Sequence, residues 1–544
     1  MSRDIANSSL TLNQSSSTST SNSINPNSNT TITRAILVGE NDNKTFTNLT
    51  ATNEGHLEVA IHDPLLPFGS VHVENLTPIF QEDAVYGLFG DANRYNSSGS
   101  GTVTASDSTF VVSTGTTIYS LADLQSRKRL RYRPGQGVVS RFTGVFSPPV
   151  NNSYQVIGLG HANDGVYFGY KNLDFGILYV NRGVRETRTL TITNASSLAQ
   201  DALITLNDVT FSYAMTANAN IQRTVYELST KTYAGWSVVP VGSTLVFLAN
   251  SAGPRTGTYV ISGSAIVGSF SRTIAGVAAN ETFVEQKNWN GDPLNGFGRS
   301  GITVDWTKGN VFQIGMQYLG FGCISFFVEV APINANNPTW LNVHTLKFPN
   351  TLTAPSFRNP SFPFTMAVYS TGSTTNLTLK SASYAGFIEG IKQFHGNRYT
   401  FNVNKPTVGI TTIPLFTIYN GLIFGGTANQ SVVYLMSISA AVKHTQPVVV
   451  YIIKNAVLVG NPNFAQYAPE SCTYLDTTAT GVTFNNNQLI WSGHLAEASN
   501  FMFDFRSMLE EIAVQPGEYI TIAAVSVSAT STFVNVSINT REDQ

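Results

Sequence analysis

The segment Gly165-Val-Tyr-Phe-Gly-Tyr-Lys-Asn-Leu-Asp-Phe-Gly-Ile-Leu-Tyr-Val180 contains two apolar and aromatic runs on either side of a short polar stretch. Val, Ile, Phe and Tyr suit a pleated, half-buried surface better than a helix. Asn and Asp between the runs supply the backbone angles of a tight turn. The segment therefore predicts a β-hairpin with strands over 166–170 and 175–179.

Similar runs lie on both sides of this segment and are separated by Gly, Asn and Asp. We expect strands over 109–113, 137–143, 188–193 and 243–248, and two long strands within 311–330 that meet at Gly320-Phe-Gly322. Many short strands at close spacing are typical of a sandwich, whereas strands that alternate with helices indicate a parallel sheet. The sequence therefore predicts an all-β protein.

The 544 residues divide by composition into four predicted parts. Residues 1–33 are rich in Ser and Asn and have almost no apolar side chains to bury, so we expect a disordered tail. Residues 34–90 predict an extended anchoring arm with short strands, because two prolines flank the apolar pair in Asp63-Pro-Leu-Leu-Pro67. Residues 91–395 predict a β-sandwich, and residues 396–544 a second β domain with one helical stretch near Leu495–Glu511.

The composition argues against several classes of function. Charged residues make up only 12 % of the chain, about half of the usual share, and the net charge is −2. No global field would therefore attract nucleic acid. We expect no membrane insertion, because the apolar runs are too short to span a bilayer, and no secretory leader. Two cysteines cannot form a disulfide framework.

Five passages together carry a resemblance to known proteins: Gly55–Gly69, Tyr132–Gly137, His161–Tyr170, Thr307–Gly322 and Val536–Gln544. They resemble structural proteins, of the capsid-associated or fibre type, from large double-stranded DNA viruses and tailed phages. The resemblance implies a concanavalin-like lectin sandwich over 91–395 and a C-terminal jelly-roll β-sandwich over 396–544. It also implies assembly on a virion, often as trimers, with contact to host glycans.

The densest basic run is Arg127-Lys-Arg-Leu-Arg-Tyr-Arg133. On a strand, alternate side chains share a face, so Arg127, Arg129, Arg131 and Arg133 would point the same way. Four guanidinium groups in a row suit contact with an anionic partner that presents phosphate, sulfate or carboxylate groups. The alternatives are a solvated strand face, or one that pairs with acids of a neighbouring subunit.

Trp289-Asn-Gly-Asp292, together with Trp306, is the candidate carbohydrate-binding site. Indole rings stack on sugar rings, while the side chains of Asn290 and Asp292 accept hydrogen bonds from hydroxyl groups. The alternative is that these residues pack in the core and in loops.

Other patterns have simpler interpretations. Gly296-Phe-Gly-Arg-Ser-Gly301 has the spacing of a dinucleotide loop but does not join a strand to a helix, so we expect an ordinary loop. His161, Asn163 and Asp164 suit a turn better than a metal or sugar site. Glu281 and Glu285 are the carboxylates that a glycan hydrolase would need, but no second strand repeats them. We therefore expect no catalytic residue, no metal and no cofactor.

The leading hypothesis from the sequence is a virion structural protein, either a minor capsid component or a surface fibre, and not an enzyme. Its predicted partners are further copies of itself in a homo-oligomer, other capsid proteins and host surface glycans. The predicted location is the virion, after synthesis in the host cytoplasm. The alternatives are a carbohydrate-binding receptor-recognition lectin of the virion and, less favoured, a glycan hydrolase.

Overall fold

The computed structural model describes residues 38–40, 46–48 and 75–543, with gaps at 162, 264, 332–337, 393–394, 444–445, 506–511 and 529–530. Chain contacts separate two units, Met1–Val73 and Glu74–Gln544. In the first unit, β1 (Val38–Glu40) pairs antiparallel with β2 (Phe46–Asn48). The predicted tail at 1–33 and the proline-containing part of the predicted arm lie outside the described residues.

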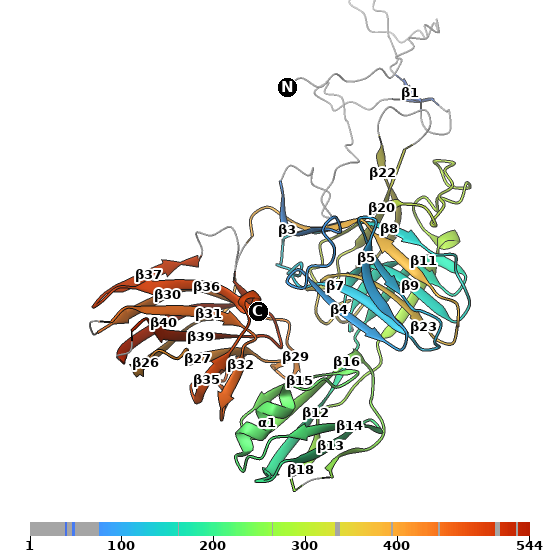
Figure 1. The fold of residues 1–544 in the computed structure, drawn as a ribbon. Coiled ribbons are helices and arrows are strands. Elements are labelled where there is room, and N and C mark those ends of the chain that lie inside the picture. The colour runs from blue at the N-terminus through green and yellow to red at the C-terminus, as the bar shows by residue number, and fades with distance from the viewer. Residues whose placement is uncertain are drawn as a thin grey trace, which may run out of the picture. The chain divides into compact units, whose positions relative to one another are not determined.

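In the second unit the chain first forms a two-sheet sandwich (Figure 1). One sheet has seven strands, in the order β19 (Asn280–Glu285), β11 (Asp174–Asn181), β10 (Gly165–Lys171), β9 (Ser153–Gly160), β23 (Phe364–Ser370), β7 (Leu121–Ser126) and β4 (Asn93–Ser98). The other has nine: β22 (Thr339–Leu346), β21 (Ile324–Val330), β20 (Asn310–Met316), β8 (Val138–Phe146), β24 (Thr378–Ser381), β6 (Thr109–Ser113) and β5 (Thr102–Ser106), with β25 (Ser383–Glu389) joining β8 to β3 (Leu76–Asp83).

One apolar core fills the space between these sheets. Phe168 comes from the seven-stranded sheet and Phe312 from the nine-stranded sheet, and their ring centroids lie 4.7 Å apart. The predicted hairpin is confirmed, because β10 and β11 pair antiparallel and Lys171 lies opposite Asp174. Residues 311–330 also form the two predicted strands, and these pair with each other as β20 and β21 across the glycine-containing loop.

Between β11 and β19 the chain builds a smaller sandwich, here called the inserted sandwich. Its four-stranded sheet has the order β15 (Trp236–Val241), β16 (Thr244–Ala252), β12 (Arg185–Asn194) and β18 (Val267–Ile274). Its three-stranded sheet has the order β14 (Val209–Met215), β13 (Gln200–Leu206) and β17 (Tyr259–Ser262). It has its own core, which includes Leu190 and Phe247. The domain predicted over 91–395 therefore contains two cores.

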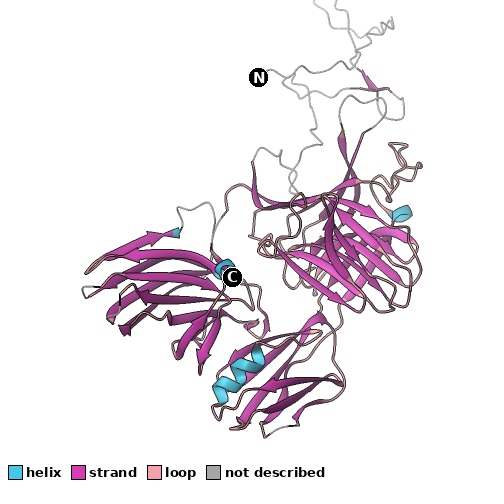
Figure 2. Cartoon of the chain, in the orientation of Figure 1, coloured by secondary structure: helices cyan, strands magenta, loops and turns pink. Residues whose placement is uncertain are grey.

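The inserted sandwich also contains the helix α1 (Ile221–Ser229), which is cyan in Figure 2. Asn220 caps its first turn, because the Asn220 side chain accepts a hydrogen bond from the backbone N–H of Arg223 at 2.9 Å. Two short 3-10 helices, η1 (Gln286–Asn288) and η2 (Asn486–Gln488), lie elsewhere in the chain. None of the helices that the structure describes has the length and apolar character needed to cross a membrane.

The C-terminal part has two further sheets. The first has the order β26 (Arg398–Val408), β40 (Thr532–Asp543), β30 (Val432–Val442) and β37 (Asn500–Asp504), with β38 (Ala513–Val514) beside β30. The second has the order β33 (Ala465–Gln466), β34 (Thr473–Asp476), β27 (Ile413–Asn420), β39 (Tyr519–Ser526), β31 (Val448–Lys454) and β36 (Leu489–Leu495). Two small hairpins pair β28 (Ile423–Phe424) with β29 (Thr427–Ala428), and β32 (Val457–Gly460) with β35 (Ala479–Thr483).

The strand order of this part is that of a jelly roll. The principal strands in chain order are β26, β27, β30, β31, β36, β37, β39 and β40. Numbered one to eight, they lie in the orders 1-8-3-6 and 2-7-4-5 in the two sheets. Two Greek keys folded into facing four-stranded sheets produce this arrangement. The predicted fold class, all-β sandwiches with a C-terminal jelly roll, is confirmed.

The helix predicted near Leu495–Glu511 is wrong for the residues that are described. Residues 500–504 form strand β37, which pairs with β30. Phe501 and Phe503 alternate along this strand, and their rings lie 5.6 and 5.7 Å from that of Trp491. Aromatic residues at a spacing of two favour a strand, and this contact outweighs the local helical preference.

Candidate functional site

The basic run does not lie on a regular strand. Strand β7 ends at Ser126, and the following residues are irregular apart from an isolated bridge between Leu130 and Phe362. The prediction that four arginines share one face of a strand is therefore wrong in its secondary structure. Side chains still alternate, because Leu130 is buried in the core of the first sandwich and Tyr132 packs against it, while the arginines contact the jelly roll.

The partners of these arginines belong to the same chain. Arg127 forms an ion pair with Glu518, and Arg129 donates to the side-chain carbonyl of Gln430. Two further arginines share one carboxylate: Asp543 contacts Arg131, with Nε 3.0 Å from Oδ2, and Arg133. The acids that three of these arginines contact, Glu518 and Asp543, thus belong to the jelly roll of the same chain and not to a neighbouring subunit. The run joins two sandwiches of one chain.

Trp289 and Trp306 are core residues. Their exposed fractions are 6 % and 5 %. The ring of Trp306 stacks on that of Phe175 with centroids 4.0 Å apart, and its Nε1 donates to the side chain of Gln286 at 3.1 Å. The Nε1 of Trp289 donates to the carbonyl of Val284. Both rings therefore pack in the core, which is the alternative that the sequence left open, and little of either ring is exposed for a sugar to stack on.

The polar residues of the same segment hold loops together. The side chain of Asn290 donates to the carbonyl of Thr345 and accepts from its N–H, both at 2.8 Å. Asp292 accepts from the N–H groups of Leu294 and Ser300 at 3.0 and 2.7 Å. The glycine-rich loop at 296–301 thus closes onto Asp292. Both side chains are engaged within the protein, and neither points to a sugar site.

The turn interpretation of 161–164 agrees with the structure. The buried carboxylate of Asp164 accepts from the N–H of Arg182 at 2.9 Å and from those of Arg358 and Asn359 at 3.3 Å. Burial nevertheless raises the pKa of Asp164, and the three N–H groups oppose that effect. Asp164 therefore holds the start of the inserted sandwich and the 358–359 loop against the end of β9.

The two carboxylates considered for hydrolysis lie on the edge strand β19 and contact lysines. Glu281 accepts from Lys171 Nζ and from the hydroxyl of Tyr154, both at 3.3 Å. Glu285 pairs with Lys287. A groove of about 340 Å³ lies beside Glu285, and its lining also includes Leu173, Asp174, Lys287, Tyr170, Phe175 and Trp306.

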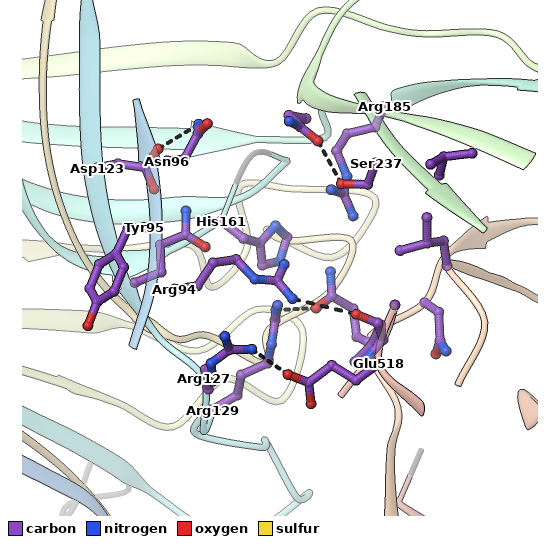
Figure 3. A pocket seen from close by; sticks show the side chains of 18 of the residues that line it. Arg94, Tyr95, Asn96, Asp123, Arg127, Arg129, His161, Arg185, Ser237 and Glu518 are labelled. Atoms are coloured by element: carbon purple, nitrogen blue, oxygen red, sulfur yellow. Dashed lines mark hydrogen bonds and ion pairs between the residues drawn. The ribbon is translucent and has the colours of Figure 1, made fainter. Parts of the chain in front are cut away.

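A larger cavity, of about 430 Å³, is lined by all three sandwiches (Figure 3). The first sandwich contributes Arg94, Asp123, Arg127, Arg129 and His161; the inserted sandwich contributes Arg185, Ser237 and Asn250; the jelly roll contributes Gln430 and Glu518. We call it the junction cavity. Among the described residues, no group of three His, Cys, Asp or Glu side chains is arranged to hold a metal ion.

Sequence reasoning found Arg127 and Arg129 but missed Arg94 and Arg185. Arg94 stands alone on β4, and Arg185 opens β12, which lies in a different sandwich. Neither has a basic neighbour at strand spacing that faces the same cavity. No local pattern identifies them, because the cavity exists only after three sandwiches come together.

Comparison with known proteins found no family model and no curated protein that matches the chain. Among solved structures, a lectin from Bauhinia forficata in complex with GalNAc aligns at 8 % identity and a TM-score of 0.22, over 56 % of this chain and 95 % of the lectin. A structure described under cell entry of botulinum neurotoxin type C, dependent on interaction with two ganglioside molecules, aligns at 8 % identity and a TM-score of 0.21. The alignment covers 82 % of this chain and 93 % of the other. An archaeal virus protein described by its triple jelly roll fold and turret assembly aligns at 8 % identity and a TM-score of 0.15. The alignment covers 82 % of this chain and 90 % of that protein. Likeness at these TM-scores does not establish a shared fold.

Proposed function

We propose that this protein is a non-catalytic structural component of a virus particle, a minor capsid or surface fibre protein that assembles through its β-sandwiches. The observation that carries the proposal is the strand order of the C-terminal domain, 1-8-3-6 facing 2-7-4-5. Jelly rolls of this order recur in viral capsid proteins and in lectins. The five passages that resemble virion proteins, and the Ser/Asn-rich segment at 1–33, support the same function.

An exposed apolar loop supports assembly. Val85, Tyr86 and Phe89 follow β3 and keep 59 %, 87 % and 54 % of their surface accessible. Clustered apolar side chains at a surface mark interaction sites more often than scattered ones do. Burial of this loop against a second copy of the chain would remove its apolar area from water and stabilise an oligomer.

Light scattering on the purified full chain tests assembly. We expect a mass that is a multiple of that of the chain, and a lower mass for the double variant Tyr86→Ser/Phe89→Ser. Phe297→Ser is the matched control, because Phe297 is also exposed but lies in a separate loop. A monomer at every concentration contradicts the proposal. Antibody labelling of intact particles then locates the protein on the virion, and unlabelled particles that contain the chain would place it inside.

A second candidate function, glycan binding at the virion surface, is favoured by the groove beside Glu285. Its lining combines the exposed apolar side chain of Leu173 with the polar side chains of Asp174, Glu285 and Lys287, a combination that suits the apolar face and the hydroxyl groups of a sugar. A glycan array with the wild type and with Asp174→Ala/Lys287→Ala tests it, with the exposed Asp201→Ala in the inserted sandwich as control. A blank array for the wild type contradicts glycan binding, and so does a signal that the groove variant retains.

A further inference from the structure

The junction cavity has an excess of positive charge. Its lining includes the arginines Arg94, Arg127, Arg129 and Arg185, but only two carboxylates, Asp123 and Glu518. Figure 3 shows these side chains converging from three parts of the chain on the same space. Guanidinium groups that are partly removed from water normally have anionic partners, because desolvation penalises an isolated charge.

Both carboxylates are already engaged. Glu518 pairs with Arg127, lies 3.5 Å from Lys454 Nζ, and accepts from the backbone N–H of Gln515 at 3.1 Å. Asp123 accepts from the side-chain amide of Asn96 at 2.9 Å, and burial raises its pKa to about 6. Arg127 is thus compensated by Glu518, and Asp123 is the one other carboxylate in the lining for the remaining three arginines.

The side chains of Arg94, Arg129 and Arg185 contact only neutral groups, or no group, among the described residues. Arg94 Nη2 lies 3.5 Å from the carbonyl of Pro516, at the limit of a hydrogen bond. Arg129 donates to Gln430, but its Nε is buried and has no hydrogen-bond partner. Arg185 forms no ion pair or side-chain hydrogen bond with any residue that the structure describes. Burial lowers the pKa of Arg94 and Glu518 and Asp123 oppose that effect, but none of the three guanidinium groups forms an ion pair with an acid among the described residues.

Other groups facing the cavity respond to this charge. Burial, and then Arg94, lower the pKa of Arg185 to about 10. Burial, followed by Arg129 and Arg185, lowers the pKa of His161 to about 3. His161 is therefore neutral at pH 7 and adds no charge of its own. These directions agree with the geometry, in which like charges share a space that a counter-ion would fit.

We propose that the junction cavity binds a small ligand that carries phosphate, sulfate or carboxylate groups, with Arg94, Arg129 and Arg185 as its cationic contacts. A guanidinium group binds two oxygens of such an anion through parallel N–H bonds. A volume of about 430 Å³ suits a small molecule rather than a polymer segment. The three arginines come from the first and the inserted sandwiches, and the jelly roll forms the remaining wall of the cavity. The ligand would therefore hold the three sandwiches together. The proposal is independent of assembly and of glycan binding at the groove.

Thermal unfolding and calorimetric titration of the full chain test it. The probes are sodium phosphate, sulfate and tripolyphosphate, with N-acetylneuraminate and glucuronate as carboxylate sources, each in a chloride buffer matched for ionic strength. We expect saturable binding of at least one probe and a Tm that rises with its concentration, because a ligand that binds only the folded state stabilises it. The probe that binds most tightly distinguishes a phosphate or sulfate ligand from an acidic sugar.

Two variants assign the effect to the cavity. Arg94→Gln and Arg185→Gln are each expected to weaken binding at least tenfold. Arg272→Gln, an exposed arginine on β18 of the inserted sandwich, is expected to bind like the wild type. Without added anion, Arg185→Gln is expected to unfold at the same temperature as the wild type or above, because it removes a charge that lacks a partner. This last measurement separates loss of the ligand from loss of the fold.

Either of two results would overturn the proposal. The first is an absence of saturable binding by all five probes. The second is equal weakening by Arg185→Gln and Arg272→Gln, which would mean that the anions bind to general surface charge. The mass measured by light scattering is obtained separately, so a failure here leaves the assembly proposal to its own test.

Discussion

The aromatic core of the first sandwich and the junction cavity differ in how their conspicuous residues are placed. The aromatic residues pack within one sandwich, whereas the arginines of the cavity come from two. In the core, Phe312 is fully buried, and its ring lies 4.7 Å from Phe168 and 6.0 Å from Trp306. Every ring there has its partners inside one sandwich. In the cavity, Arg129 and Arg185 come from two sandwiches and still lack a carboxylate among the described residues. Aromatic residues that look like a ligand site can thus serve only packing, while scattered arginines can form a site.

The largest effect is expected where the core is emptied. Phe312→Ala removes a buried ring that contacts both sheets, so we expect the free energy of unfolding to fall by about 3–5 kcal/mol. Chemical denaturation measures the change. Phe297→Ala is the control, because Phe297 is 93 % exposed and should cost less than about 0.5 kcal/mol. Equal losses for the two variants would mean that the ring at 312 is not packed as described.

The next effect is expected at the contact between the basic run and the jelly roll. Asp543→Asn preserves size but leaves Arg131 and Arg133 without their shared carboxylate, and Asp543 is buried. We expect a loss of about 3 kcal/mol, because removing one member of a buried pair leaves the other charge uncompensated. A separate, earlier unfolding transition of the jelly roll in calorimetry would show that this contact couples the two sandwiches. An unchanged transition would contradict that coupling.

A pH-dependent effect of intermediate size is expected at Asp123. Burial raises the pKa of this carboxyl to about 6, above its unfolded value, so the folded state binds the proton more readily. The stability that this group contributes is present below about pH 4 and is lost as the pH rises through 6. We expect Asp123→Asn to become more stable than the wild type across that window, by about 3 kcal/mol above pH 6, at about 1.36 kcal/mol per pKa unit.

The measurement at Asp123 must be the difference between variant and wild type at each pH. His161, whose pKa is lowered to about 3, acts with the opposite sign and loses stability as the pH falls below about 6.5. Asp208→Asn is the control, because hydrogen bonds from Thr258 lower the pKa of Asp208. That variant should lose stability relative to the wild type as the pH rises. A difference for Asp123→Asn that does not change with pH would contradict the burial of a charged group there.

The smallest effect is expected at the surface. Lys171 and Glu281 form an ion pair at 3.3 Å with both side chains about one-third exposed. Glu281→Gln should change the free energy of unfolding by less than about 1 kcal/mol, because solvent screens such pairs. Denaturation in low and high salt checks this, and the effect should shrink as salt is added. A loss comparable to that of Asp543→Asn would remove the distinction between surface and junction ion pairs.

Local pattern was enough to predict some elements and not others. The hairpin at 166–179 follows from two apolar runs and a polar turn, and its two strands pair antiparallel as expected. The helix expected near 495–511 is wrong for residues 500–504, because Phe501 and Phe503 pack against Trp491, a contact that the local pattern does not contain. The inserted sandwich could not be recognised, because its strands have the same composition and spacing as those of the sandwich that surrounds it.

The class of the fold follows from local sequence: apolar residues at a spacing of two, turns rich in Asn, Asp and Gly, and few charged residues lead to antiparallel sheets wherever they pair. The burial and the partners of the candidate site residues, in contrast, depend on the tertiary structure. Trp306 became a core residue because Phe175 covers its ring, and Arg131 found its partner 412 positions away in Asp543. Strand formation depends on neighbours along the chain, whereas burial and charge pairing depend on which distant surfaces meet.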